Sequence, residues 1–256
     1  MNRSWWSAGP LFRTRLRTRI DGRGCPSCGG RAFAQRQVIR DHLAESWELS
    51  PREREWFDQR EGNHCQSCGM SLRVRMLAWS LRRLFPRLGE LRVLHLNQVN
   101  HLSPLLQPAQ ELIETTHLPG EPWGAEIGGL INQDLESLTF ADGSFDLVIH
   151  SETLEHVFDP GRAMSEIYRV LKPGGRQLYS VPVLHGRATR RRLARVDGEV
   201  VELLPPSYHG VDREFPVVWE LGGDFIRGRR RHIERVHYDD FWRNPTVFSV
   251  LERKGA

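Results

Sequence analysis

The sequence predicts an α/β protein in which a mostly parallel sheet, covered by helices on both faces, follows a small four-cysteine module. From Leu91 onward, short apolar runs alternate with helical stretches, a pattern typical of βαβ units. All 4 cysteines of the 256-residue chain lie before that point, in two Cys-x-x-Cys pairs. Pro86 and Gly89 mark the change in pattern. We therefore expect the module in residues 1–86 and the α/β domain in 87–256.

The two cysteine pairs read Cys25-Pro-Ser-Cys28-Gly and Cys65-Gln-Ser-Cys68-Gly. Two intervening residues place both sulfurs on one tight turn, and the following glycine lets backbone amides turn toward the thiolates. Four thiolates in tetrahedral coordination suit zinc, so we predict a zinc ribbon with structural zinc and no open position. A redox pair normally occurs singly beside a βαβ unit, and disulfides are disfavoured in a reducing cytosol.

Helices are expected on either side of the second cysteine pair. Residues 41–60 are charged and helix-forming, with Ser50 as a cap and Pro51 at the start of a second helical stretch. Residues 71–85 carry leucines and a methionine at helical spacing between arginines, which predicts a helix joining the two parts of the chain.

Five short apolar runs predict the strands of the sheet, at residues 91–96, 112–115, 130–133, 145–150 and 177–181. The clearest helix of this part runs from Pro160 to Leu171, because its apolar residues share one face. The sequence Lys172-Pro-Gly-Gly175 should end it. Residues 231–237 and 246–252 are two further strand-like runs.

The segments 134–157 and 166–175 resemble the central motifs of S-adenosylmethionine (SAM) dependent methyltransferases of the type 11 group. The first reads Asp134-Leu-Glu-Ser-Leu-Thr-Phe-Ala-Asp-Gly-Ser-Phe-Asp-Leu-Val-Ile-His-Ser-Glu-Thr-Leu-Glu-His-Val, and the second Glu166-Ile-Tyr-Arg-Val-Leu-Lys-Pro-Gly-Gly. The resemblance implies a Rossmann-like class I methyltransferase sheet, whose last two strands would be the two final runs. It also implies S-adenosyl-L-methionine as cofactor and methyl transfer that depends mainly on alignment.

The resemblance assigns cofactor contacts residue by residue. Asp134 matches the acid that accepts a hydrogen bond from the adenine amino group, and Leu135 the neighbour that provides a backbone contact and stacking. His150 and Ser151 would line the cofactor floor, because ligands of open α/β sheets bind beyond the carboxyl ends of the strands. A turn or N-cap role is the alternative for Asp134. Glu114 is the candidate ribose ligand, with Glu111 as the alternative.

The loop after the first strand departs from the family. Where the family carries glycines, this chain reads Asn97-Gln98-Val99-Asn100. Asparagine is the non-glycine residue that most readily adopts left-handed geometry, so Asn97 and Asn100 could hold a similar turn. We expect their amides and Gln98 to bind the amino and carboxylate groups of the cofactor. The alternative is a non-catalytic scaffold or binding module, with a ribbon that recognises a protein or nucleic acid.

The acceptor should bind at an insertion of about residues 183–231, since this group of enzymes commonly places substrate contacts after the fifth strand. We expect Tyr208 or His209 to act as general base, because a neutral imidazole is suited to deprotonating a hydroxyl; a turn beside Gly210 is the alternative. His185 is a further candidate for a substrate contact, whereas His156 is expected to be a structural helix residue. The arginines of 187–195 would dock an acidic substrate or form a solvated face.

Composition narrows the class of protein. A hydrophobic fraction of 39% and a charged fraction of 27% are ordinary for globular proteins. The chain has no apolar run near the roughly 20 residues that a membrane span needs, and residues 1–10 lack a secretory signal pattern, so we expect a cytoplasmic protein. Despite the net charge of +4, nucleic acid is not an expected partner. The missing Gly-x-Gly-x-x-Gly disfavours a nucleotide-dependent oxidoreductase. A small molecule or glycan is the expected methyl acceptor.

Overall fold

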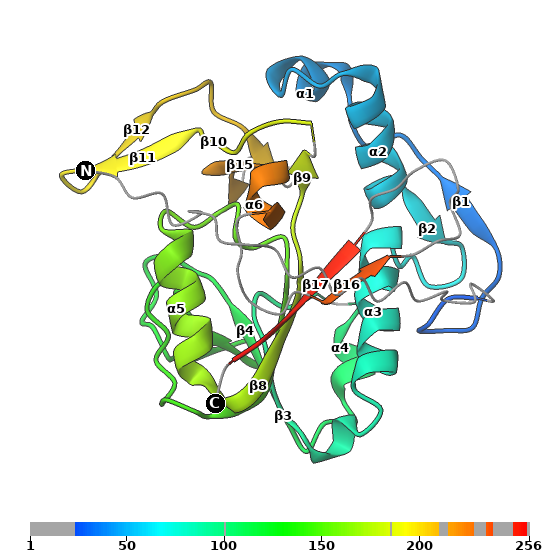
Figure 1. Ribbon diagram of the computed structural model, residues 1–256, viewed down its shortest axis with the longest axis vertical. Helices are drawn as coiled ribbons and strands as arrows, with labels where there is room; N and C mark the ends of the chain where they lie inside the picture. Colours follow the sequence, from blue (N-terminus) through cyan, green and yellow to red (C-terminus); the bar gives the residue numbers. More distant parts are fainter. Residues whose placement is uncertain are drawn as a thin grey trace.

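The computed structural model describes residues 24–99, 101–184, 186–209, 215–227, 234–237 and 248–254. Its centre is an eight-stranded sheet of order β16-β17-β8-β7-β3-β4-β6-β5 (Figure 1). The strands are β3 (Arg92–His95), β4 (Glu111–Thr116), β5 (Glu126–Ile127), β6 (Leu130–Asn132), β7 (Phe145–Ser151), β8 (Leu171–Ser180), β16 (Glu234–His237) and β17 (Phe248–Arg253). The five strands from β8 to β6 are parallel, and β5, β16 and β17 run antiparallel to their neighbours. The predicted fold class is confirmed.

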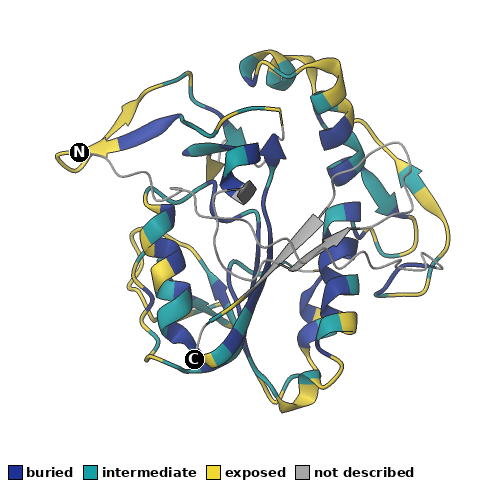
Figure 2. Cartoon of the chain, in the orientation of Figure 1, coloured by how far each residue is buried: buried dark blue, intermediate teal, exposed yellow. Residues whose placement is uncertain are grey.

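Alternation along the central strands divides the core into two layers. Leu94 and Val148 point toward helix α5 (Pro160–Val170), while the adjacent Val93 and Leu147 belong to the cluster around α3 (Leu72–Leu84). Successive strand side chains face opposite sides, so a buried run must supply apolar residues to both. The helices α5 and α3 lie on either side of the sheet in Figure 1, and the sides they turn to it are buried in Figure 2.

The N-terminal part continues directly into this core. It consists of β1 (Phe33–Gln35), α1 (Asp41–Ser46), α2 (Pro51–Gly62) and β2 (Asn63–Cys65), with β1 and β2 paired antiparallel. Ser50 and Glu53 form a reciprocal capping box at the start of α2, as the sequence predicted for Ser50. Cys25 and Cys65 lie in the same apolar cluster as Leu178 of β8. One hydrophobic core therefore spans both sides of the predicted boundary at residue 86.

The connections on either side of β3 are short. The 3-10 turn η1 (Leu88–Glu90) lies between α3 and β3, and the four-residue α4 (Ser103–Leu106) follows β3. Between β4 and β6 the described chain makes loops and the β5 strand without a helix. The Pro/Gly-rich stretch 117–124 accounts for this, because it offers no helical period.

The insertion after β8 folds as small β units packed against the N-terminal helices. These are β9 (Val183–Leu184), β10 (Arg190–Arg191), β11 (Leu193–Val196), β12 (Glu199–Glu202), β13 (Tyr208–His209), β14 (Phe215–Pro216), β15 (Trp219–Gly222) and α6 (Gly223–Arg227). β10, β15 and β9 form one sheet, and β11–β12 and β13–β14 are separate pairs.

Helix α5 ends at Val170, just before residues 172–175, which were expected to end it. Those four residues lie within β8, where an irregularity in the pairing with β7 absorbs the extra residues. Gly174 there has φ +77°, which glycine adopts without strain. His156 lies in a turn after β7, not in a helix. Within the described residues, no helix has the length and apolarity needed to cross a membrane.

Candidate cofactor and metal sites

The carboxyl ends of four neighbouring parallel strands bring together the residues expected to bind the cofactor. β7, β3, β4 and β6 are adjacent, with His95 of β3 level with both Ile149 and Glu114. Thr116 pairs with Asn132 at the end of β6. The segments that follow these strands therefore share one edge of the sheet. Asn97, Gln98, Glu114, Asp134, Leu135, His150 and Ser151 all belong to it.

The glycine-free loop after β3 makes a tight turn at Asn97, whose φ is +49°. Its backbone amide donates to Thr115 Oγ1 at 3.1 Å, and the amide of Gln98 donates to the Thr115 carbonyl at 2.9 Å. The Val99 amide donates to His95 Nε2 at 3.2 Å. Asparagine thus takes the left-handed position, and the neighbouring strand β4 fixes the loop. Asn100 lies outside the described residues.

Glu114 accepts hydrogen bonds from His95, at the end of β3, and from Gln98, in the loop that follows. His95, which is fully buried, donates from Nδ1 to Glu114 Oε1 at 2.8 Å, since its Nε2 already accepts from Val99. Gln98 Nε2 donates to the other carboxylate oxygen at 3.2 Å. The His95 hydrogen bond is the main reason that the pKa of Glu114 is lowered. A carboxylate has about four acceptor positions, so Glu114 retains capacity for further donors. Glu111 instead pairs with Arg92 at 2.6 Å, at the opposite end of β4.

Asp134 and Leu135 begin the segment after β6. Asp134 Oδ1 accepts the Glu136 amide at 2.8 Å, which is the Asx-type turn foreseen as its alternative role. The second carboxylate oxygen is not used by this turn. The Leu135 side chain is 6% exposed and packs in the core beside α5.

The end of β7 is tied to the N-terminal helices by charge. The His150 ring is buried and stacks on Tyr179, with centroids 4.7 Å apart. Ser151 Oγ lies 2.7 Å from Ser180 Oγ and accepts a hydrogen bond from Arg73 of α3. Glu152, with φ +52°, pairs with Arg60 of α2 at 2.5 Å.

Burial alone would raise the pKa of Glu152, but the charges of Arg60 and Arg73 outweigh it and hold the pKa at about 2. Sequence reasoning did not identify this group of three residues. Glu152 lies in a recognised motif, but no local pattern connects it with arginines on helices that precede the sheet.

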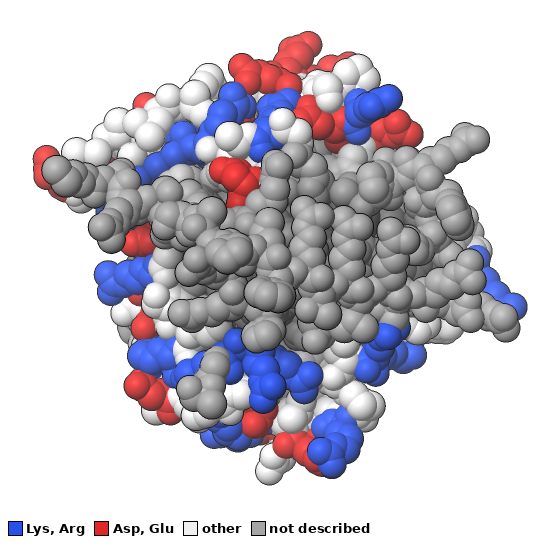
Figure 3. Space-filling model, in the orientation of Figure 1, with Lys and Arg blue, Asp and Glu red and all other residues white. Residues whose placement is uncertain are grey.

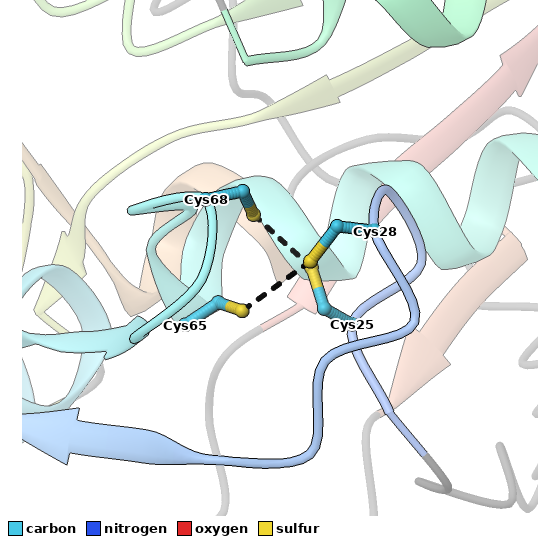
Figure 4. A group of neighbouring side chains, drawn as sticks. All are labelled: Cys25, Cys28, Cys65 and Cys68. Carbon is cyan, nitrogen blue, oxygen red and sulfur yellow. Dashed lines mark hydrogen bonds between the residues drawn. The ribbon is translucent and has the colours of Figure 1, made fainter.

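The four cysteine side chains converge from two equivalent turns (Figure 4). Cys25 and Cys68 sulfurs are 3.5 Å apart, and Cys28 and Cys65 sulfurs 3.6 Å. Tetrahedral zinc with Zn–S bonds of about 2.3 Å would separate its sulfurs by about 3.8 Å. In each turn the glycine after the second cysteine has positive φ, +72° at Gly29 and +77° at Gly69. The thiols are therefore placed as a four-thiolate site requires.

A second group of potential ligands lies beyond the end of β7. His209 Nδ1 is 3.2 Å from His156 Nε2, and Glu155 Oε1 is 3.7 Å from the same nitrogen. Glu155 is fully buried. Burial is the main reason that the pKa of His209 is lowered to about 3, and it also lowers the pKa of His156. Both imidazoles are therefore neutral at pH 7.

Within the insertion expected to bind the methyl acceptor, His209 is the residue that contacts the segment after β7, through His156. Tyr208 and His209 form β13, which pairs with residues 215–216 of β14. The His209 ring also contacts Trp47, with centroids 5.4 Å apart. Ser207 accepts a hydrogen bond from the Trp47 indole. His185 and Gly210 lie outside the described residues.

The arginines of 187–195 are used inside the protein. Arg187 pairs with Glu53 of α2 at 2.7 Å, and Arg190 bridges Glu48 and Glu220. Arg192, 2% exposed, also pairs with Glu220. A solvated face is wrong for the buried Arg192, whereas substrate docking by the run stays a prediction. Figure 3 shows the resulting mixture of basic and acidic groups at the top of the molecule, over α1 and α2.

In a comparison with known protein families, residues 90–179 match a family described as a methyltransferase domain. The uncharacterized protein YafE of Escherichia coli is 54% identical over 41 residues, which are 16% of this chain and 20% of that protein. The ubiquinone/menaquinone biosynthesis C-methyltransferase UbiE of Haemophilus ducreyi is 45% identical over 56 residues, 21% of this chain and 22% of that protein. The chain thus spans about a fifth of the length of these curated relatives.

Solved structures of similar shape include an S-adenosylmethionine dependent methyltransferase from Mesorhizobium loti, 19% identical, with a TM-score of 0.42 over 69% of this chain and 97% of that chain. Another is the Burkholderia thailandensis 1,6-didemethyltoxoflavin-N1-methyltransferase with bound 1,6-didemethyltoxoflavin and S-adenosylhomocysteine. It is 12% identical, with a TM-score of 0.44 over 88% of this chain and 95% of that chain.

Proposed function

We propose, from the premise that residues 90–179 belong to the methyltransferase domain family, that this chain transfers a methyl group from S-adenosylmethionine to a small-molecule or glycan acceptor. The observation that carries the proposal is the cofactor edge: Asn97 makes the left-handed turn that glycine would otherwise make, beside the carboxylate of Glu114. Ligands of such sheets bind beyond the carboxyl ends of the strands.

The residues at this edge match the chemistry of the cofactor. Glu114 and Asp134 each keep acceptor capacity, for the ribose hydroxyls and the adenine amino group respectively. Because the side chain of Leu135 is buried, its backbone is the part left to contact the adenine. The side chains of Asn97, Gln98 and Asn100 would meet the amino and carboxylate groups, and His150 and Ser151 would form the floor. Bound SAM supplies an electrophilic methyl group, and the protein aligns the acceptor with it.

The acceptor would approach from the side of Tyr208 and His209. Their place beside His156, next to the end of β7, supports this assignment. The lowered pKa makes His209 available as a neutral acceptor of protons, but also a weak base, so positioning of the acceptor is the larger part of its expected role. Tyr208 is the second candidate base.

Structural zinc is proposed at the four cysteines. Their mutual distances and the two identical turns support it, and four protein ligands would leave no position for chemistry. All four cysteines carry free thiols, which suits a reducing compartment, and we therefore propose the cytoplasm.

Calorimetric titration of zinc-loaded protein with SAM and with S-adenosylhomocysteine tests the proposal. We expect micromolar binding that weakens at least about tenfold in Asp134→Ala, the loss of one charged hydrogen bond. Asp142→Ala is the matched control, because this exposed carboxylate pairs with Arg169 before β7, away from the cofactor edge. Absence of binding by a folded sample would contradict the proposal and favour the scaffold function. The backbone amides of Asn97, Gln98 and Val99 already donate hydrogen bonds within the chain, so they would not be available to a cofactor, which would explain such an absence of binding.

A further inference from the structure

We propose that Glu155, His156 and His209 form a second metal site, which takes a divalent cation of the zinc type and leaves one coordination position open. It is separate from the four cysteines and does not depend on the binding of SAM. With a metal bound, His209 would be a ligand and Tyr208 would be the remaining candidate base. Three features of the molecule support the site: the geometry of the three ligand atoms, the burial of Glu155 and the hydrogen bond that orients His156.

The ligand atoms are already spaced as a metal requires. His156 Nε2 and His209 Nδ1 are 3.2 Å apart, and Glu155 Oε1 lies 3.7 Å and 4.0 Å from these two nitrogens. A tetrahedral zinc ion with bonds of about 2.0–2.1 Å holds its ligand atoms about 3.4 Å apart. Small side-chain adjustments would therefore complete the site. Two imidazoles and a carboxylate are a common donor set for catalytic zinc.

His156 is oriented as metal-binding histidines usually are. Its Nδ1 lies 2.8 Å from the carbonyl oxygen of Pro216, so Nδ1 carries the proton and donates, and Nε2 presents its lone pair to the cluster. A hydrogen bond from the other ring nitrogen to a carbonyl fixes the tautomer and raises the basicity of the ligand. Without a metal this lone pair accepts a hydrogen bond from His209 Nδ1. Metal binding would therefore require the other tautomer of His209, in which the proton lies on Nε2 and Nδ1 presents its own lone pair.

The buried carboxylate of Glu155 is the feature that most directly indicates a cation. Its side chain has no exposed surface, and neither carboxylate oxygen has a hydrogen-bond partner from another residue in the described part of the chain. Its backbone carbonyl accepts from the amides of Val218 and Trp219, which holds the residue at this point. A buried carboxylate without partners is costly unless it is protonated or binds a cation. Burial, and then the charge of Glu152, raise the pKa of Glu155 well above its usual value.

The neighbouring charges do not oppose a cation. Arg60 and Arg73 lie close by, but they are paired with Glu152 and Glu61. This leaves the Glu155 carboxylate as the local charge that a metal would neutralise. Three protein ligands leave a fourth position, which would take water or an oxygen atom of another molecule.

Cobalt titration of the full chain tests the site. The protein is first loaded with one equivalent of zinc, which fills the four cysteines, and Co²⁺ is then added. We expect one further ion to bind and to show d–d absorption without the intense thiolate charge-transfer bands of a cysteine site. His209→Ala and Glu155→Gln should each weaken this binding by more than about tenfold. His42→Ala, which removes an exposed histidine far from the cluster in sequence, should bind as the wild type does.

Two results of the cobalt titration would overturn the proposed metal site. Failure of the wild type to bind a second ion would overturn the proposal, as would unchanged binding in both cluster variants. Glu155→Gln keeps the size of the side chain, so it guards against the case in which His209→Ala does not fold. The melting temperature and the retained first zinc report folding of each variant. Because no step uses SAM, the result is independent of the calorimetric test of methyltransferase function.

Discussion

The cysteine turns and the loop after β3 each hold one residue in the left-handed region of backbone conformation, but they use different residue types to do so. In each case the turn brings the polar groups of a candidate site together. The cysteine turns use Gly29 and Gly69, at φ +72° and +77°, whereas the loop uses Asn97 at +49°. A third such position is Glu152, at +52°. Glycine adopts this geometry freely; asparagine does so at small cost, and glutamate only when other contacts hold it.

The difference shows what stabilises each turn. The cysteine turns close on their own backbone, since the amide of Gly29 donates to the Cys25 carbonyl and that of Gly69 to the Cys65 carbonyl, both at 2.8 Å. The Asn97 turn depends on Thr115 of the neighbouring strand, and Glu152 on arginines of the N-terminal helices. The first kind is determined locally, and the other two require the completed fold.

Removing the proposed zinc should have the largest effect, because the four thiolates would lose the cation that holds the two turns against each other. We expect a strong chelator, or Cys65→Ser, to unfold the N-terminal part and to destabilise the sheet as well. Metal binding to such four-thiolate sites contributes on the order of 10 kcal/mol. Circular dichroism with and without chelator measures the loss. Cys28 is the exposed cysteine, and its serine variant serves as the milder companion. An unchanged melting curve after verified metal removal would show that the turns need no metal.

Breaking the ion pairs of Glu152 should have the next largest effect. Glu152→Gln would remove the carboxylate that pairs with both guanidinium nitrogens of Arg60, which is 2% exposed, and would leave Glu61 as its remaining partner, at a cost of about 3 kcal/mol. Urea unfolding at pH 7 measures the change.

The same pair predicts how stability depends on pH. The folded pKa of about 2 is below the usual 4.5, so the unfolded chain takes up this proton first. The stabilisation, about 3 kcal/mol, is complete above pH 4.5 and is lost as the pH falls toward 2. Glu152→Gln should flatten the stability curve in that range. A variant curve parallel to that of the wild type would contradict the assignment.

The smallest effects should come from exchanging the turn residues themselves. Gly69→Ala places a Cβ at φ +77° and should cost about 1–2 kcal/mol. Asn97→Gly should change stability by less than about 0.5 kcal/mol, because relief of the left-handed strain offsets the greater freedom of the unfolded chain. Urea unfolding of both variants compares them directly. A large loss in Asn97→Gly would mean that the asparagine side chain, not its backbone geometry, holds the loop.

The same contrast explains how much the sequence could reveal. The four cysteines, the capped helix at Ser50 and the strands of the sheet all carry local signals, and the structure confirms those elements and the convergence of the thiols. The left-handed Asn97 was predicted from its residue type alone. The placement of Arg60, Arg73 and Arg192 was not, because ion pairs between segments far apart in the chain leave no periodic pattern.

The shared core has a consequence for the order of events during synthesis. Cys25 and Cys65 leave the ribosome early, but the cluster that buries them also contains Leu147 and Leu178 from the central strands. The cysteines are therefore synthesised before the apolar residues of the central strands against which they pack. A nascent chain that captures its metal early would hold α3 beside the first turns until β3, β7 and β8 arrive. With zinc at the proposed site, the supply of metal would affect folding of the whole sheet, and not merely of the segment that carries the cysteines.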